Sequence, residues 1–155
     1  MMHEAVAGLQ GVADYLDGIY WHHAHGAEAN AAMLFQSRLN HVFRLFADHE
    51  ESVSRPLVEY LSGRKNVRLL GRATAAGDQR MPTFSFTVKD KSSAEVVAAL
   101  HRRNVAVNNH HFYAKRLLEA VGVDPDDGVA RESLVYYSSR SDVVRLIDAL
   151  DAVLD

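Results

Sequence analysis

The spacing of apolar residues changes once along this chain of 155 residues, just after Gly63. Before that glycine, apolar residues recur every three or four positions, which is typical of amphipathic helices. We expect one helix over residues 4–20 and a longer one over residues 29–61, with a kink or a restart at Pro56. Beyond Gly63 the apolar stretches become short, and strand-like and helical spacings alternate. This order is typical of an α+β protein.

The clearest strand signal lies at residues 83–88, where apolar and hydroxyl side chains alternate as in a half-buried strand. Further strands are predicted at residues 67–71, 105–107 and 129–136. Ser92 or Ser93 should cap a helix that has Glu95 in its first turn. Two more helices are expected, one around residues 117–121 and one after Ser139 or Ser141.

These elements predict an α+β fold: N-terminal helices followed by a small, mainly antiparallel sheet of about four strands, with helices packed on one face. We divide the chain into a linking helix and long helix (residues 1–63) and a small C-terminal α+β domain (residues 64–155). The composition, with 48% hydrophobic and 24% charged residues, is that of an ordinary globular protein. The two parts are therefore expected to form effectively one compact unit.

Charge and composition exclude several classes of function. The net charge is −3 and the basic residues are scattered, so no basic stripe for nucleic acid is present. No apolar run approaches the roughly 20 residues of a membrane span, and the N-terminus does not resemble a secretory signal. The chain contains no cysteine, which rules out disulfides, thiolate metal sites and a cysteine nucleophile. We expect a cytoplasmic protein without nucleic-acid or membrane partners.

Histidines are frequent in the first part of the chain, but their spacing does not define a metal site. Zinc sites usually combine histidines with acidic residues or cysteines at fixed spacing, and that pattern is absent. We predict no physiological metal, although incidental nickel or zinc binding stays open. The histidines concerned are His22, His23, His25, His41 and His49.

Arg131, at the start of the last predicted strand, is the first candidate for a binding residue. A guanidinium group can hold a carboxylate through two parallel charged hydrogen bonds. The alternative is that Arg131 pairs with Glu132 or another surface acid. The second candidate is the segment of residues 108–114, where Asn109 precedes His110 and His111, two histidines that could orient a substrate or titrate near neutral pH. The segment is equally consistent with ordinary loop residues that have no special role.

The strand that holds Arg131 resembles a motif of the class V aminotransferases, a pyridoxal-phosphate family that includes the cysteine desulfurases. The family motif has the form Val-Arg-x-Ser-Leu-x-x-Tyr-Asn-Thr. Arg131, Ser133, Leu134 and Tyr137 match it in order, while residues 138–139 are serines in place of Asn-Thr. The family arginine grips the substrate α-carboxylate. The resemblance therefore implies this role for Arg131.

Two further segments extend the resemblance to essentially the whole chain. Residues 108–114 are similar to the desulfurase loop Gly-His-His-Cys-Ala, but Tyr113 stands in the place of the cysteine that attacks sulfur. The resemblance therefore implies that persulfide chemistry is absent. Residues 3–16 resemble the helix that follows the family's Thr-Gly-Thr motif. In this chain Met1 and Met2 stand in the place of that motif.

The resemblance also implies what the chain would need from elsewhere. Pyridoxal phosphate is the cofactor of the intact enzymes, and the lysine that binds it belongs to a large domain. None of Lys65, Lys89, Lys91 and Lys115 has the context of that lysine. We therefore expect the C-terminal small domain of such an enzyme, inactive alone and without bound cofactor.

The expected partners are the missing large domain or subunit and a small amino-acid-like carboxylate. Without a large domain, apolar surface on the long helix should be exposed and lead to a homo-oligomer. The candidate interface residues are Met33, Leu34, Phe35, Leu39, Phe43 and Phe46. The alternative is a stand-alone domain that binds a small ligand or a protein without catalysis.

Overall fold

The computed structural model describes residues 3–26 and 30–154, and the chain divides into two compact units. One unit comprises residues 1–48 and the other residues 49–155. The long helix α2 (Phe35–Gly63) contributes its first part to one unit and its second part to the other. The division expected at residues 63 and 64 stays a prediction. Each unit is described by itself.

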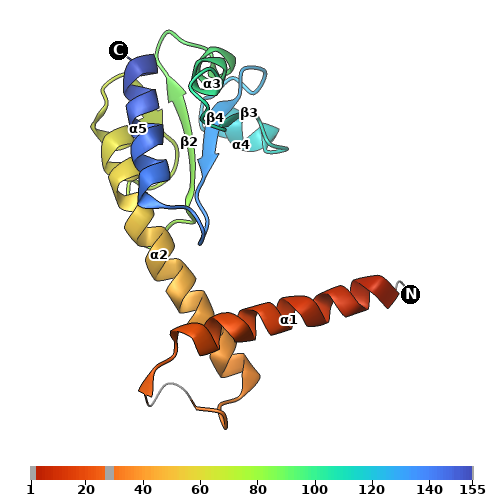
Figure 1. Ribbon diagram of the computed structural model, residues 1–155. Coiled ribbons are helices and arrows are strands. Elements are labelled where there is room, and N and C mark those ends of the chain that lie inside the picture. Colours follow the sequence, from red (N-terminus) through yellow and green to blue (C-terminus); the bar gives the residue numbers. More distant parts are fainter. Residues whose placement is uncertain (1–2, 27–29, 155) are drawn as a thin grey trace. The chain divides into compact units, whose positions relative to one another are not determined.

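The first unit consists of α1 (His3–His23), the connection that follows it and the start of α2 (Figure 1). Tyr20, Ala24 and Val42 are buried in a small cluster of their own. Helix α1 extends as far as His23, so part of the connection expected after residue 20 is helical. The indole nitrogen of Trp21 donates to Asp17 one turn earlier, at 3.1 Å, and this contact favours continuation of the helix.

Helix α2 runs through Pro56 as a single helix, so the restart that proline can cause does not occur. Proline removes one hydrogen bond of the helix ladder. The residues that follow it, Leu57, Val58 and Leu61, are buried in the core of the second unit. Their burial stabilises the last turns of α2 although the hydrogen bond at Pro56 is absent.

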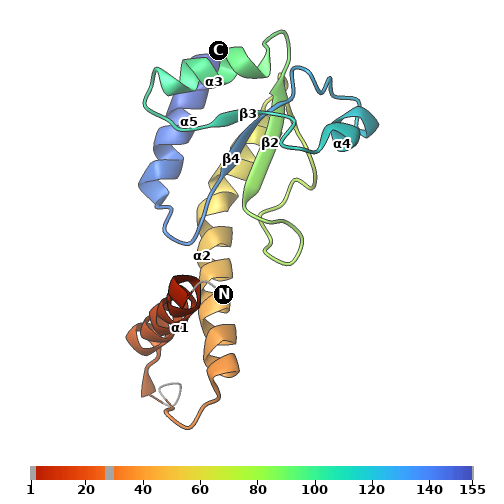
Figure 2. The ribbon, with the colours of Figure 1, turned by 90° about the vertical axis from the view of Figure 1, so that its right-hand side faces the viewer.

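The second unit contains, over the described residues, a four-stranded sheet in the order β1-β2-β4-β3, and all its neighbouring strands are antiparallel (Figures 1 and 2). This arrangement confirms the predicted α+β fold with a small antiparallel sheet. The strands are β1 (Val67–Leu69), β2 (Thr83–Val88), β3 (Asn108–His110) and β4 (Val129–Ser133). The helices are the second part of α2, α3 (Ser93–His101), α4 (Lys115–Ala120) and α5 (Arg140–Leu154).

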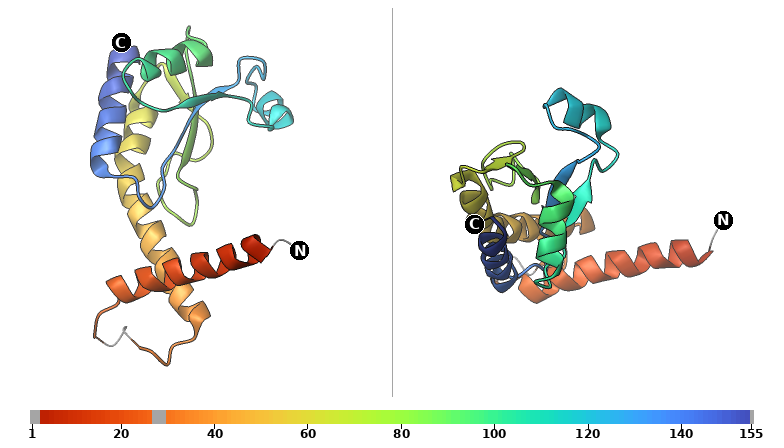
Figure 3. Two further views of the ribbon diagram at one scale, coloured as in Figure 1. Left: turned by 45° about the vertical axis from the view of Figure 1, so that its right-hand side comes forward. Right: turned by 90° about the horizontal axis from the view of Figure 1, so that it is seen from above.

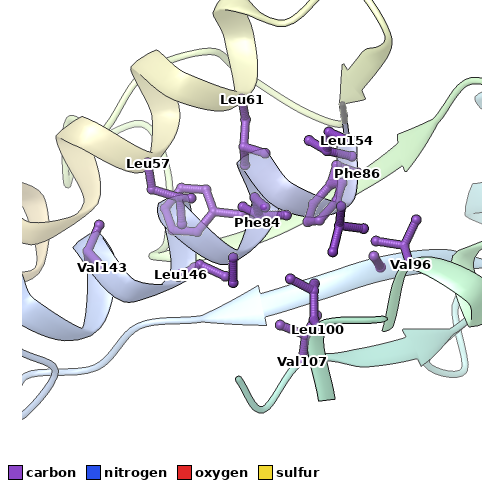
Figure 4. Packing of buried hydrophobic residues seen from close by; sticks show 14 of the residues in the cluster. Leu57, Leu61, Phe84, Phe86, Val96, Leu100, Val107, Val143, Leu146 and Leu154 are labelled. Atoms are coloured by element: carbon purple, nitrogen blue, oxygen red, sulfur yellow. The ribbon is translucent and has the colours of Figure 1, made fainter. Parts of the chain in front are cut away.

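The core lies on the face of the sheet that is covered by α2, α3 and α5, while α4 lies on the other side (Figure 3). The alternation of β2 places Phe84 and Phe86 in this core, and both are fully buried. They pack with Leu57 from α2, Leu100 from α3 and Leu146 from α5 (Figure 4). The opposite face of the sheet carries hydroxyl, amide and guanidinium groups beside a small apolar cluster of Leu118, Val123 and Val129, and it holds the candidate site.

Strand β1 ends at Leu69, two residues before its predicted end, and two further strands also differ from the sequence prediction in their bounds. Strand β3 begins at Asn108, beyond the predicted segment 105–107, because the amide of Val105 closes the end of α3 by donating to Leu100 at 3.1 Å. Strand β4 ends at Ser133 because the amide of Val135 is used in a turn with Ser138. Local turn bonds thus displaced strand pairing at both places.

The predicted caps of the two helices are confirmed. Ser92 and Glu95 form a reciprocal capping box at the start of α3. Ser139 and Asp142 form the corresponding pair of bonds at the start of α5. In the part of the chain described, no helix combines the length and apolar character that would let it cross a bilayer.

Candidate functional site

The strand register places Arg131 in the middle of the polar sheet face. Arg131 on β4 lies directly opposite Ser85 on β2 and Asn108 on β3. Residues directly opposite each other in antiparallel strands project to the same face. One pair further along, the hydroxyls of Thr83 and Ser133 are 3.2 Å apart. Arg131 is therefore flanked on both sides by uncharged groups that can donate and accept hydrogen bonds.

The guanidinium of Arg131 lies over an aromatic ring and has no acidic partner. Its central carbon is 3.5 Å from the centroid of the Phe112 ring. No carboxylate among residues 3–26 and 30–154 forms an ion pair with it. Glu132, the neighbour named as a possible partner, lies opposite Phe84 and so belongs to the other face. The structure thus leaves the charge of the half-buried Arg131 unpaired within the described chain.

The loop between β3 and α4 supplies the ring, and its backbone is unusual. Phe112 and Tyr113 both have left-handed backbone conformations, with φ of 48° and 61°. Such conformations are costly for residues other than glycine, and they cluster at functional sites. The amide of Tyr113 donates to Nδ1 of His111 at 3.1 Å, so this ring nitrogen is an acceptor. The bond fixes the ring orientation of His111 and the turn that follows it.

A glycine at the start of β4 lets this loop approach the strand. Gly128 has φ of 73°, and a Cβ atom there would lie 2.4 Å from the carbonyl carbon of His110. That distance is far inside van der Waals contact, so no other residue fits without displacing the backbone. The loop and the strand of Arg131 are therefore held together by direct backbone contact.

The structure brings only some of the predicted site residues together. His110 ends β3 and His111 begins the loop that holds Phe112, and the two histidine ring centroids are 4.1 Å apart. Asn109 is not on the face of Arg131, because it lies opposite the buried Ala130. Its amide nitrogen instead donates to the hydroxyl of Ser93 at the start of α3, at 3.2 Å. Asn109 is therefore held in a bond with α3 and does not line the polar face.

Asn108 belongs to the candidate segment 108–114, but the sequence analysis gave it no role at the site. It projects beside Arg131, but its place depends on the pairing of β3 with β4. The sequence predicted β3 at residues 105–107, and a shift in register exchanges the two faces of a strand. The turn bond of Val105 at the end of α3 excludes Val105 from the sheet, and the apolar pattern of residues 105–107 does not signal that bond.

Tyr113 and the lysines occupy the surroundings of the site. The side chain of Tyr113 is fully exposed and does not pack on the sheet. Lys115, at the start of α4, lies 3.8 Å from Asp126, and Lys91 donates to the carbonyl of Val153. Lys65 and Lys89 are exposed at the ends of α2 and β2. Within the described ranges, no group of three or more histidine, aspartate or glutamate residues is arranged to hold a metal ion.

Known proteins are similar to this chain in sequence. The family model for Aminotransferase class-V matches residues 16–146, and the chain therefore belongs to the class V aminotransferase family. It is 37% identical over 109 residues to the aminotransferase-like protein FGM3 of Gibberella zeae, covering 70% of this chain and 27% of that protein. It is 33% identical over 109 residues to a probable cysteine desulfurase of Pseudomonas putida, covering 70% of this chain and 25% of that protein. The chain thus spans about a quarter of the length of these relatives.

Solved structures of cysteine desulfurases share the fold. The cysteine desulfurase CsdA of Escherichia coli has a TM-score of 0.59 at 22% identity, over 77% of this chain and 29% of that one. The apo cysteine desulfurase of Thermococcus onnurineus has a TM-score of 0.61 at 18% identity, over 84% of this chain and 34% of that one. At these identities the likeness concerns the fold alone.

Proposed function

We propose that this chain is the carboxylate-binding C-terminal small domain of a class V aminotransferase or cysteine desulfurase-like enzyme, with Arg131 as the binding residue. The observation that carries the proposal is the unpaired guanidinium of Arg131 in the middle of the polar sheet face. A carboxylate that binds in the guanidinium plane would receive two parallel charged hydrogen bonds. Ser85 and Asn108 flank the guanidinium and would hydrogen-bond the rest of the ligand.

His110 and His111 extend this proposed site along the loop. Nδ1 of His111 accepts from the amide of Tyr113, so the neutral ring carries its proton on Nε2 and can donate from there. Its neighbour His110 is in ring contact with it. The ligand class that these groups suit is a small amino acid or keto acid. Asn109 would affect the site only indirectly, by holding β3 in position, because its side-chain amide donates a hydrogen bond to Ser93.

Enzymes of this family use pyridoxal phosphate, which needs a lysine for covalent attachment. The described residues do not fit that requirement, because Lys115 faces Asp126, Lys91 is bonded to Val153, and Lys65 and Lys89 lie at the ends of elements. We therefore propose that a large domain or subunit outside these residues holds the cofactor. In this proposal the chain is not catalytically active alone.

Calorimetry with small amino acids and keto acids tests the role of Arg131. We expect the unmodified chain to bind such ligands and Arg131→Ala to bind roughly tenfold or more weakly, because a charge-assisted bidentate contact is lost. Arg116→Ala is the matched control, since Arg116 is an exposed arginine on α4. Equal binding by the unmodified chain and Arg131→Ala would refute the proposed site.

A visible spectrum tests the proposal about the cofactor. The chain is incubated with pyridoxal phosphate and the spectrum is recorded before and after borohydride reduction. We expect no reducible aldimine band at stoichiometric level. A stoichiometric band would show that a lysine of this chain can carry the cofactor, and the proposal of an external large domain would fall.

A second candidate function is a protein-interaction domain without catalysis. It is favoured by apolar side chains that α1 exposes at every third position, among them Val6, Leu9, Val12 and Tyr15. Exposed apolar surface of this kind is typical of interaction sites. Self-association or partner binding in the absence of any carboxylate binding would favour this function over the first.

A further inference from the structure

The contact between Arg131 and Phe112 restricts how the guanidinium can lie. A separation of 3.5 Å between the central carbon and the ring centroid is the van der Waals distance between two flat groups. At that distance the guanidinium fits only face to face on the ring, because an edge-on group would overlap it. In the stacked arrangement one face of the guanidinium is covered, and its N–H donors, which lie in its plane, are left uncovered by the ring.

We propose that Phe112 is a positioning residue, which holds the guanidinium of Arg131 flat so that its donor edge is presented to a planar carboxylate. This inference rests on the proposed function, in which Arg131 binds that carboxylate. Phe112 itself would not touch the reacting atoms of the ligand. Its effect would be to reduce the number of orientations that the long, flexible arginine side chain explores before the ligand arrives.

The fold fixes the ring from several directions. Phe112 packs against the small cluster of Leu118, Val123 and Val129 on the α4 side of the sheet. The contact of Gly128 with His110 fixes the backbone before the ring, and the bond from Tyr113 to His111 fixes the backbone after it. The left-handed φ of 48° costs on the order of 1 kcal/mol or more for a residue that is not glycine. The fold retains this cost where it places an aromatic face against the guanidinium of Arg131.

A purely structural role would not require an aromatic face. If Phe112 served only to fill the cluster with Leu118, a leucine of similar bulk would replace it with little effect on Arg131. If the stacking matters, replacement by leucine should change Arg131 itself. A tyrosine, which keeps the aromatic face, should leave Arg131 unchanged.

Nuclear magnetic resonance of the full chain separates these roles. A proton over an aromatic face is shifted upfield, so the Nε–H resonance of Arg131, assigned with Arg131→Lys, reports the stacking directly. We expect an upfield shift in the unmodified chain and in Phe112→Tyr, and its loss in Phe112→Leu. Phe112→Gly is a second ring-free variant, which relieves the left-handed backbone, and urea denaturation of both variants shows that the folded state is the one observed. Leu118→Ala, which removes another side chain of the cluster, should keep the shift.

Titration with pyruvate completes the test on the same samples. We expect roughly two- to fivefold weaker binding in Phe112→Leu and Phe112→Gly, the size of an exposed cation–π contact, and unchanged binding in Phe112→Tyr. Absence of the upfield shift in the unmodified chain would overturn the inference. So would unchanged pyruvate binding in both ring-free variants. Absence of pyruvate binding in the unmodified chain, with the shift present, would instead overturn the proposed function on which the inference rests.

Discussion

Single residues set the geometry around Arg131, and the backbone leaves little freedom at two of them. Gly128 has a left-handed backbone and no room for a Cβ atom, and Phe112 has a left-handed backbone in spite of its side chain. Both lie where the loop 110–113 meets the strand of Arg131. The placement of the arginine therefore depends on positions that make no contact with a ligand in the proposed site.

Replacing Gly128 by alanine tests this dependence. We expect Gly128→Ala to lower the free energy of unfolding by roughly 3 kcal/mol or more, because the new Cβ would overlap the carbonyl carbon of His110. Gly122→Ala is the matched control: its φ is 71°, but nothing lies within 4 Å of the added atom. That variant should lose only about 1 kcal/mol. Urea denaturation of both measures the difference, and equal losses would contradict the overlap.

Glu132 gives the clearest expected dependence on pH. Burial raises the pKa of its carboxyl group to about 7 from an ordinary value of 4.5, and a backbone hydrogen bond of Ser133 opposes that rise. Glu132 lines a cavity of about 230 Å³ together with Leu134, Asp142 and Arg145, among others. The native state therefore keeps its proton at pH values where the unfolded chain has released it.

The sign of the effect follows from this retained proton. Stability from Glu132 is fully present below pH 4.5 and declines as the pH rises to about 7, by up to about 2 kcal/mol after allowance for solvent screening. Glu132→Gln should abolish this decline and be more stable than the unmodified chain above pH 7. Glu119→Gln, at an exposed site on α4, is the control. A stability difference between Glu132→Gln and the unmodified chain that stays constant from pH 4 to pH 8 would disprove the assignment.

At the scale of elements, the sequence predicted those structures whose signals are local. Strand β2 follows from its alternation, and the starts of α3 and α5 follow from Ser92 and Ser139. Arg131 could be proposed from its motif. Its neighbours could not, because Ser85 and Asn108 reach it only through the pairing of three strands. The position of Phe112 at the guanidinium depends on left-handed backbone conformations at Phe112 and Tyr113, which aromatic residue types do not signal.

The N-terminal cap of α5 allows the contribution of a single helix end to stability to be tested. The hydroxyl of Ser139 accepts from the amide of Asp142 at 3.2 Å, and the Ser139 amide donates to the Asp142 carboxylate at 2.9 Å. Ser139→Ala should lower the free energy of unfolding by about 1 kcal/mol. Hydrogen bonds from Ser139 also lower the pKa of Asp142, so that pKa should rise toward its ordinary value in the variant.

Thermal or urea unfolding and a titration of Asp142 by nuclear magnetic resonance measure these two effects. Ser52→Ala is the control, because Ser52 is an exposed serine in the interior of α2. Alanine is the more favourable residue inside a helix, so this control should not be destabilised. Equal destabilisation by the two substitutions would argue against the cap.

At the scale of the whole molecule, exposed apolar surface is the main feature that the two units leave unexplained. Of the residues predicted for an interface, Leu34, Phe35 and Phe43 are exposed, while Met33 and Phe46 pack against the small cluster of the first unit. Helix α1 adds a row that includes Leu9, whose side chain is 69% exposed. This surface supports the expectation of self-association or of a large partner domain.

Analytical ultracentrifugation tests that expectation. We expect the unmodified chain to self-associate at high concentration, and a Leu9→Glu, Val12→Glu variant to shift toward monomer by placing charges in the apolar row. Gln10→Glu adds a charge to α1 at a position that is already polar and should leave the association unchanged. A clean monomer of the unmodified chain at high concentration would contradict the prediction.

The backbone contact between Gly128 and His110 also has a mechanical consequence. Because the strand of Arg131 begins at this contact, the loop that bears Phe112 is coupled to the strand without an intervening flexible side chain. We expect a rotation of the sheet to carry the ring and the guanidinium along together. If Arg131 binds a carboxylate as proposed, a movement of the sheet would leave the alignment of the arginine on its ring unchanged.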